Sequence, residues 1–138
     1  MKEWSKHWIS SKLPKKQRKY RHNAPLHIRH KMMSAHLSEE LRKKYNTRAL
    51  PVRKGDKVKI MRGQFRGVIG EIERVSLRQM KVIVKGAEFK AKAGAAPRKY
   101  PLDASNLMII TPNMDDKMRV ESLGKGLEKP AKASAGKK

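Results

Sequence analysis

Hydrophobic and polar residues alternate in short runs through the middle of the chain, between residues 51 and 110. Such an alternation is typical of strands with one buried face. It slips at Val75, a few residues after Gly70, which indicates a bulge or sharp bend. Short strands joined by glycine-bearing turns predict a small β-barrel. The candidate strands are residues 57–60, 68–73, 80–85, 87–91 and 107–110.

The pattern before this region is different. Residues 11–22 have no hydrophobic period of either kind and predict an extended basic arm. Two short helices are expected to follow. Asn23 and Pro25 are typical of a cap and a first turn, and Ser38 is a preferred N-cap for the second helix. Asn46 can end that second helix.

The pattern after the β region predicts one more short helix, at residues 115–123, with Gly124 as its stop. The low-complexity stretch from residue 125 onward cannot bury a core and predicts a disordered basic tail. We therefore expect a mainly β protein in three parts. They are a basic N-terminal extension with two short helices at 1–50, a barrel at 51–110, and a short helix with a tail at 111–138.

The net charge indicates that this β domain binds a polyanionic partner. The chain of 138 residues carries 35 Lys and Arg against 12 Asp and Glu, a formal net charge of +23. Nucleic acid is the most frequent partner of such a chain. An anionic membrane surface is the alternative, but it requires a long apolar stripe that the sequence lacks. No run is apolar enough for membrane insertion or a secretory signal, so a cytoplasmic protein is expected.

The residue types also narrow the chemistry. With no cysteine, the chain excludes disulfide scaffolds, cysteine-ligated zinc and thiol catalysis. The five histidines all lie between residues 7 and 36, in a basic region without a metal-ligand spacing. No nucleophile stands beside a base in a known signature. We therefore expect no catalytic residue, no metal, no cofactor and no small-molecule substrate.

One stretch, residues 52–78, combines several informative features. Gly55 and Asp56 form a turn dipeptide before the first candidate strand. Gly63 and Gly67 bracket a hairpin tip that carries two arginines and a phenylalanine. The arginines can each donate two hydrogen bonds to a phosphate, and the phenylalanine ring offers a surface on which a base can stack. Taken singly, each glycine is equally compatible with a generic hairpin that has a charged tip.

The complete set resembles the KOW motif, an RNA- and protein-binding element of SH3-like barrels. The flanking segments at 23–35, 37–45 and 48–56 are similar to the archaeal and eukaryotic branch of the L24 family of large-subunit ribosomal proteins. The resemblance covers about residues 12–110. It implies an SH3-like barrel that binds large-subunit ribosomal RNA early in assembly, near the rim of the nascent-chain exit. Neighbouring ribosomal proteins and factors at the exit are the implied protein partners.

Two rival functions follow from the same residues. A KOW-type transcription elongation factor would carry a preceding α/β domain, and residues 1–50 are too short for one. An RNA-modifying enzyme would need an active site, and no candidate is visible.

The residues expected to bind ribosomal RNA are cationic, polar or aromatic and come from the arm, the first helix, the segment before the first strand and the hairpin tip. They are Lys12, Lys15, Lys16, Arg18, Lys19, Tyr20, Arg21, His22, His27, Arg29, His30, Lys31, Arg53, Lys54, Arg62, Gln64, Phe65 and Arg66.

The charge generates a first prediction. Binding to ribosomal RNA should weaken steeply with salt, because each neutralised phosphate contributes a slope of about −0.7 to −0.9 in log K against log salt. Filter binding of labelled ribosomal RNA over a salt series measures that slope. A slope near zero would contradict an electrostatic basis for binding.

Overall fold

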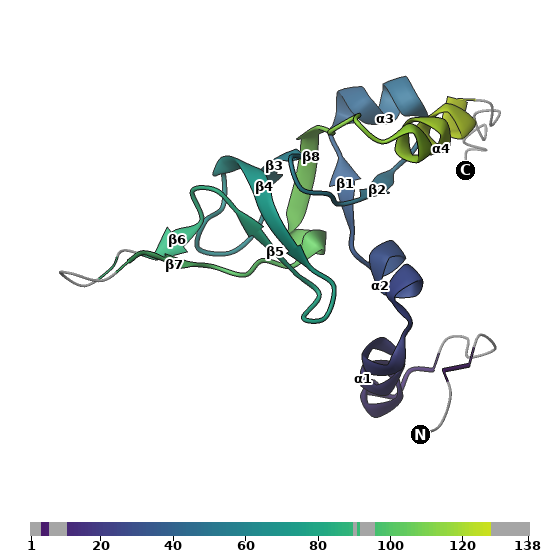
Figure 1. Cartoon of the computed structure of the whole chain (residues 1–138), viewed down its shortest axis with the longest axis vertical. Coiled ribbons are helices and arrows are strands. Elements are labelled where there is room, and N and C mark those ends of the chain that lie inside the picture. Colours follow the sequence, from purple (N-terminus) through teal and green to yellow (C-terminus); the bar gives the residue numbers. More distant parts are fainter. Residues whose placement is uncertain (1–3, 6–10, 90, 92–95, 128–138) are drawn as a thin grey trace, which may run out of the picture.

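The computed structural model describes residues 4–5, 11–89, 91 and 96–127. Its centre is a six-stranded sheet in the order β2-β1-β8-β3-β4-β5, from which α1 and α2 extend on one side and the β6–β7 ribbon on another (Figure 1). The strands are β1 Ser34–Leu37, β2 Ala49–Pro51, β3 Lys57–Ile60, β4 Ile69–Ser76, β5 Lys81–Val84, β6 Glu88–Phe89, β7 Arg98–Lys99 and β8 Leu107–Thr111. The helices are α1 Pro14–Asn23, α2 Leu26–Met32, α3 Glu39–Tyr45, the 3-10 turn η1 Ala104–Asn106 and α4 Lys117–Leu127.

The predicted strands of the middle region are confirmed, with changes at their ends. β3 matches its predicted bounds, and the predicted bulge lies in β4, where the register with β5 shifts between Ile72 and Arg74. β5 begins one residue later than predicted, because Met80 has a positive φ of 54° and belongs to the turn. β6 is shorter than the predicted strand at 87–91.

The sheet is mixed and is not closed into the predicted barrel. β1 runs parallel to β8 and antiparallel to β2, whereas the β8–β3–β4–β5 pairs are antiparallel. β1 thereby occupies the edge of β8 that faces away from β3. Within the described residues β5 does not pair with β8 or β2, and its outer edge is met by a single antiparallel bridge between Val82 and Leu102. The sheet thus includes strands from both sides of residue 50.

α1 corrects the prediction of an extended arm at residues 11–22. Lys, Arg and Gln favour helices. Pro14 stands at the first helical position, where a backbone N–H would have no partner within the helix, so its absence costs nothing. Gln17 Nε2 donates to the Ser11 carbonyl at 3.0 Å, and the Trp4 ring packs on Tyr20 with centroids 5.2 Å apart. The helix buries none of its residues, so there is no hydrophobic period to reveal it.

The two predicted short helices are confirmed as α2 and α3. Ser38 caps α3 as expected, since its Oγ accepts from the Leu41 N–H at 3.4 Å. Asn46 ends α3 in the left-handed region with φ of 46°. α2 differs at its start, because Pro25 rather than Asn23 precedes its first turn, without a side-chain cap.

α4 starts and ends later than the predicted helix at 115–123. Gly124 lies inside the helix and does not stop it. A helical glycine costs only about 1 kcal/mol relative to alanine, and Leu123, 2% exposed in the core, holds this turn against the sheet. Residues 125–127 of the predicted tail are therefore helical, and residues 128–138 lie outside the described residues.

The hydrophobic core lies under the sheet and collects side chains between Met33 and Leu123, whereas α1 contributes none. Its fully buried members are mainly branched aliphatic residues at alternate strand positions, as a pleated sheet requires. They include Leu37, Val58, Ile60, Val82, Val84, Leu107 and Ile109, each 0% exposed.

One ion pair is buried beside this core. Arg119 of α4 donates two hydrogen bonds to the Asp56 carboxylate, from Nη1 to Oδ1 at 2.7 Å and from Nη2 to Oδ2 at 2.8 Å. The Asp56 oxygens also accept from the backbone N–H groups of Arg53 and Asn113, both at 2.8 Å. Arg119 donates further to the carbonyls of Asn113 and Pro51. The pair therefore joins β2, the turn before β3, the segment after β8 and α4.

Removing either partner should destabilise the protein strongly. Asp56→Ala or Arg119→Ala leaves an unpaired buried charge, a loss of about 3–5 kcal/mol in the free energy of unfolding. Lys85→Ala serves as the matched control, because it breaks the exposed pair with Glu71 at 2.8 Å and should cost less than about 1 kcal/mol. Urea unfolding measures both. Equal losses in the buried and exposed variants would disprove the anchoring role of Asp56.

Candidate nucleic-acid interface

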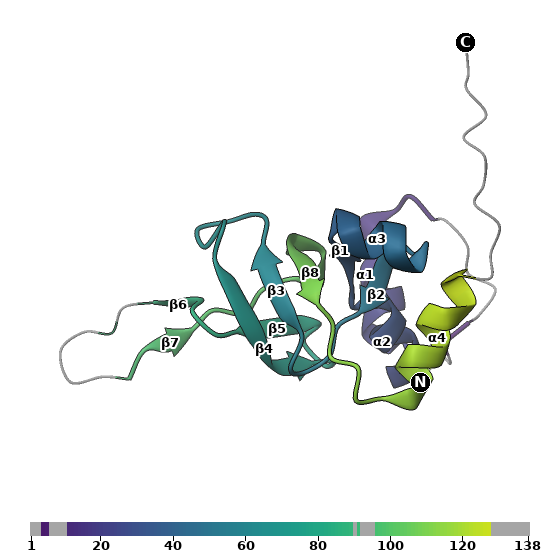
Figure 2. The same cartoon turned by 90° about the horizontal axis from the view of Figure 1, so that it is seen from above.

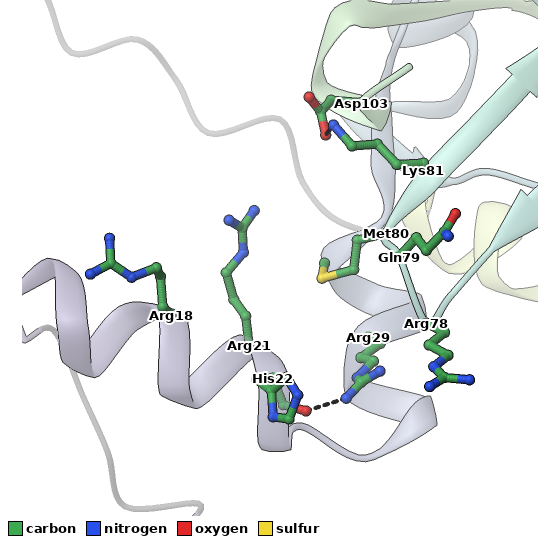
Figure 3. A pocket seen from close by; sticks show the side chains of 9 residues that line it. All are labelled: Arg18, Arg21, His22, Arg29, Arg78, Gln79, Met80, Lys81 and Asp103. Atoms are coloured by element: carbon green, nitrogen blue, oxygen red, sulfur yellow. Dashed lines mark hydrogen bonds and ion pairs between the residues drawn. The ribbon is translucent and has the colours of Figure 1, made fainter. Parts of the chain in front are cut away.

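A cationic cleft of about 720 Å³ lies between α1 and the β4–β5 hairpin (Figure 3). α1 contributes Arg18 and Arg21, and the hairpin contributes Arg78, Gln79 and Lys81. His22, Arg29, Met80 and Asp103 complete its walls. Guanidinium groups that line one open cleft repel one another, and a phosphate bound there relieves that repulsion and accepts their forked hydrogen bonds. We call this site the cationic cleft.

The α1 wall is held in place by Arg29 of α2. Its Nε donates to the Ala24 carbonyl at 2.8 Å, and its Nη2 donates to the His22 carbonyl (Figure 3). These bonds use the carbonyls at the end of α1, which lack intrahelical partners. Arg29 is thus partly a structural residue that sets the direction of α1 relative to α2.

The hairpin wall depends on an unusual turn. Met80 is one of two non-glycine residues with positive φ in the described chain. Such a conformation costs about 1–3 kcal/mol and persists where the surroundings enforce it. Met80 packs against the core, while Arg78 and Gln79 beside it are exposed. Lys81 Nζ binds Asp103 Oδ1 at 2.8 Å, which neutralises the single acid in the cleft wall.

The residues predicted from the sequence include four of this cleft, Arg18, Arg21, His22 and Arg29. They do not include Arg78, Gln79 and Lys81, which in the sequence resemble ordinary polar positions of a turn and strand. No local signal in the sequence marks these positions, because a turn without glycine is common between strands.

Three other predicted residues, His30, Arg53 and Lys54, line a second cleft between α2 and β4. The remaining predicted residues of α1 and α2 lie outside both clefts. Lys12, Lys15, Lys16, Lys19, His27 and Lys31 are exposed. Tyr20 is half-buried and stacks with Trp4, and Trp8 lies outside the described residues.

The predicted hairpin tip is confirmed as the loop between β3 and β4. Gly63 and Gly67 take φ of 91° and 92°, which only glycine adopts without strain. Arg62, Gln64 and Arg66 are exposed, but the tip lines neither of the two clefts. It lies away from α1, at the other end of the sheet (Figure 2).

Phe65 at this tip is less available for stacking on RNA than expected. Its ring packs against those of Phe89 and Tyr100, with centroids 5.8 and 5.4 Å away. The three rings connect the tip to the β6–β7 ribbon. Phe65 is half-buried, whereas Phe89 and Tyr100 are 39% and 37% exposed.

The acids of β4 are matched by lysines from neighbouring strands. Glu71 accepts from Lys85 Nζ at 2.8 Å, and Glu73 accepts from Lys99 Nζ. The Lys85 hydrogen bond lowers the pKa of Glu71, and the Lys99 hydrogen bond lowers the pKa of Glu73. Both carboxylates therefore stay ionised at neutral pH, and their charges are locally balanced by lysines rather than left to repel phosphate.

Two further properties of the described residues bear on the kind of site. No group of three or more metal-ligating His, Asp or Glu side chains comes together among them. None of the helices in the described part of the chain is long and apolar enough to cross a membrane.

Comparison with known proteins gives the family. A family model that describes the ribosomal proteins called L26 in eukaryotes and L24 in archaea matches residues 11–125. The large ribosomal subunit protein uL24 of Methanosphaera stadtmanae is 44% identical over 115 residues, which cover 83% of this chain and 97% of that protein. The matched range contains both walls of the cationic cleft and the whole sheet. The chain therefore belongs to the ribosomal protein family that comprises eukaryotic L26 and its archaeal L24 counterpart.

Proposed function

We propose that the chain is a structural, non-enzymatic constituent of the large ribosomal subunit and binds ribosomal RNA with the cationic cleft as a principal contact. The observation that carries this proposal is the meeting of Arg18 and Arg21 of α1 with Arg78 of the β4–β5 turn. These three arginines form no ion pair within the described part of the chain. Their charges are thus available to a phosphate backbone.

The geometry of the cleft suits folded RNA. Double-stranded RNA is recognised by shape and through its phosphates and 2′-hydroxyls, rather than by reading its deep major groove. α1 buries none of its own residues, so its exposed cationic side chains can lie against RNA. The family name and the related uL24 support ribosomal RNA as the target. They give no support to the transcription elongation factor considered from the sequence.

We extend the proposal to the finer expectations that the family resemblance raised. The β3–β4 hairpin is the KOW hairpin of an SH3-like sheet whose closure β1 prevents. Its turn glycines, Gly55, Gly63 and Gly67, all have positive φ, which supports this assignment. The protein acts in the cytoplasm, joins the subunit early in assembly, and lies near the nascent-chain exit. There it contacts neighbouring ribosomal proteins and exit factors.

Removing two cleft arginines should weaken RNA binding more than removing two cations elsewhere. Arg21→Ala with Arg78→Ala removes two phosphate contacts and should flatten the salt slope by about 1.4–1.8. Lys43→Ala with Lys44→Ala, on exposed positions of α3, removes the same charge as a matched control. Arg62→Ala with Arg66→Ala tests the hairpin tip in the same assay. If the cleft and α3 variants bind alike, the cleft is not the contact.

Association with ribosomes tests the function itself. Tagged protein should co-sediment with large subunits through a sucrose gradient at high salt, and the Arg21→Ala, Arg78→Ala variant should leave the subunit at lower salt. Protein that stays at the top of the gradient, or that sediments with small subunits, would refute the assignment.

A further inference from the structure

The second cleft differs in character from the cationic cleft. It encloses about 610 Å³ between α2, the segment before β3 and the end of β4. Its floor is apolar: Val52 is 1% exposed, and Val75 and Leu77 are half-buried and pack against the core. The register shift of β4 lies just before Val75 and Leu77, so the bulge helps to direct this end of the strand toward α2. We call this site the apolar cleft.

Cations form the rim of the apolar cleft. Lys54 and Arg74 are exposed and form no ion pair in the described structure, while Arg53 Nη2 binds Asp116 at 2.6 Å. The one acid of the rim, Glu73, is engaged by Lys99 and is locally balanced by it. An apolar floor below a cationic rim fits a flat apolar group attached to a phosphate. Neither a bare phosphate nor a neutral apolar side chain would use both parts.

The two clefts are neighbours in the chain and in space. Arg29 lines the cationic cleft and the next residue, His30, lines the apolar cleft. In the same way Leu77 lines the apolar cleft and Arg78 the cationic one. Consecutive residues are about 3.8 Å apart at their Cα atoms. A single RNA strand can therefore hold its phosphates in one cleft and turn a base into the other.

From this arrangement we infer that the apolar cleft receives one unpaired nucleobase of the RNA whose backbone lies in the cationic cleft. The inference rests on the proposed RNA binding and adds to it a preference for a bulged nucleotide. Sequence-specific contacts to RNA are made to such unstacked bases, because the bases of a helix are hidden in its deep groove. Val52, Val75 and Leu77 would cover the base, His30 would lie beside it, and Lys54 with Arg74 would hold its phosphate.

The test uses the full chain and three synthetic hairpin RNAs of one stem sequence. The first has a single bulged adenosine, the second an abasic residue at the bulge, and the third a fully paired stem. Filter binding at fixed salt should show the bulged adenosine bound at least about fivefold more tightly than the abasic RNA, because the base buries its apolar faces against the aliphatic floor. A 2-aminopurine at the bulge should change its fluorescence on binding.

Leu77→Ser is the variant that tests the apolar floor, and Ile69→Ser is its matched control. Both remove a branched apolar side chain from β4 or its turn, but Ile69 is 51% exposed and lies outside the apolar cleft. Leu77→Ser should reduce the preference for adenosine over the abasic RNA to within about twofold, whereas Ile69→Ser should keep it. If Leu77→Ser does not fold, the proposal is tested on the wild type, by the ratio of its affinities for the bulged-adenosine and abasic RNAs and by the 2-aminopurine fluorescence change.

The outcomes separate this inference from the function on which it rests. If the wild type binds the bulged, abasic and paired RNAs equally and with a steep salt slope, the base site is overturned while RNA binding stands. If none of the three RNAs nor ribosomal RNA is bound, the proposed function fails as well. A preference that Leu77→Ser leaves unchanged would also overturn the site, because the base would then bind elsewhere.

Discussion

The architecture depends on the buried pair between Asp56 and Arg119. A buried ion pair contributes little net stability, because both charges lose their hydration. Its effect is positional: the carboxylate also accepts two backbone N–H groups, and the guanidinium also donates to two carbonyls. If α4 moved away, the Asp56 carboxylate would lose its paired cation, and the Arg119 guanidinium would lose the carboxylate and both carbonyls. The pair therefore holds the C-terminal helix and the start of β3 in one arrangement, beside α3 (Figure 1).

This anchoring lets the rest of the chain carry a large excess of positive charge. The sheet supplies a packed core, and many cations lie on α1, which buries none of its residues, and on exposed positions of the β4–β5 turn. Their mutual repulsion opposes compaction in the free protein and is removed when phosphates lie between them. RNA binding should therefore stabilise the fold, because RNA binds the native arrangement of these cations more tightly than it binds the unfolded chain.

Both clefts are lined by residues of α2 and of the β4–β5 hairpin. Arg29 uses its guanidinium to orient α1, and His30, the next residue, lines the apolar cleft. Met80 has a positive φ, which is unfavourable for a non-glycine residue, and the turn to which it belongs places Arg78 in the wall of the cationic cleft. Small shifts of α2 would change both clefts together, so phosphate and base recognition are expected to be coupled.

Features that depend on neighbours along the chain can be read from the sequence alone. These are the strands at 57–60 and 107–110, the bulge near Val75, the Ser38 cap, the glycine-bracketed tip and the charge that indicates a nucleic-acid partner. Local spacing and capping chemistry suffice for them. Contacts between distant residues come from the tertiary structure, such as the pairing of Asp56 with Arg119, 63 residues away, and the parallel pairing of β1 with β8. The same holds for Arg21 and Arg78, which line one cleft because distant packing, and no local period, brings them together.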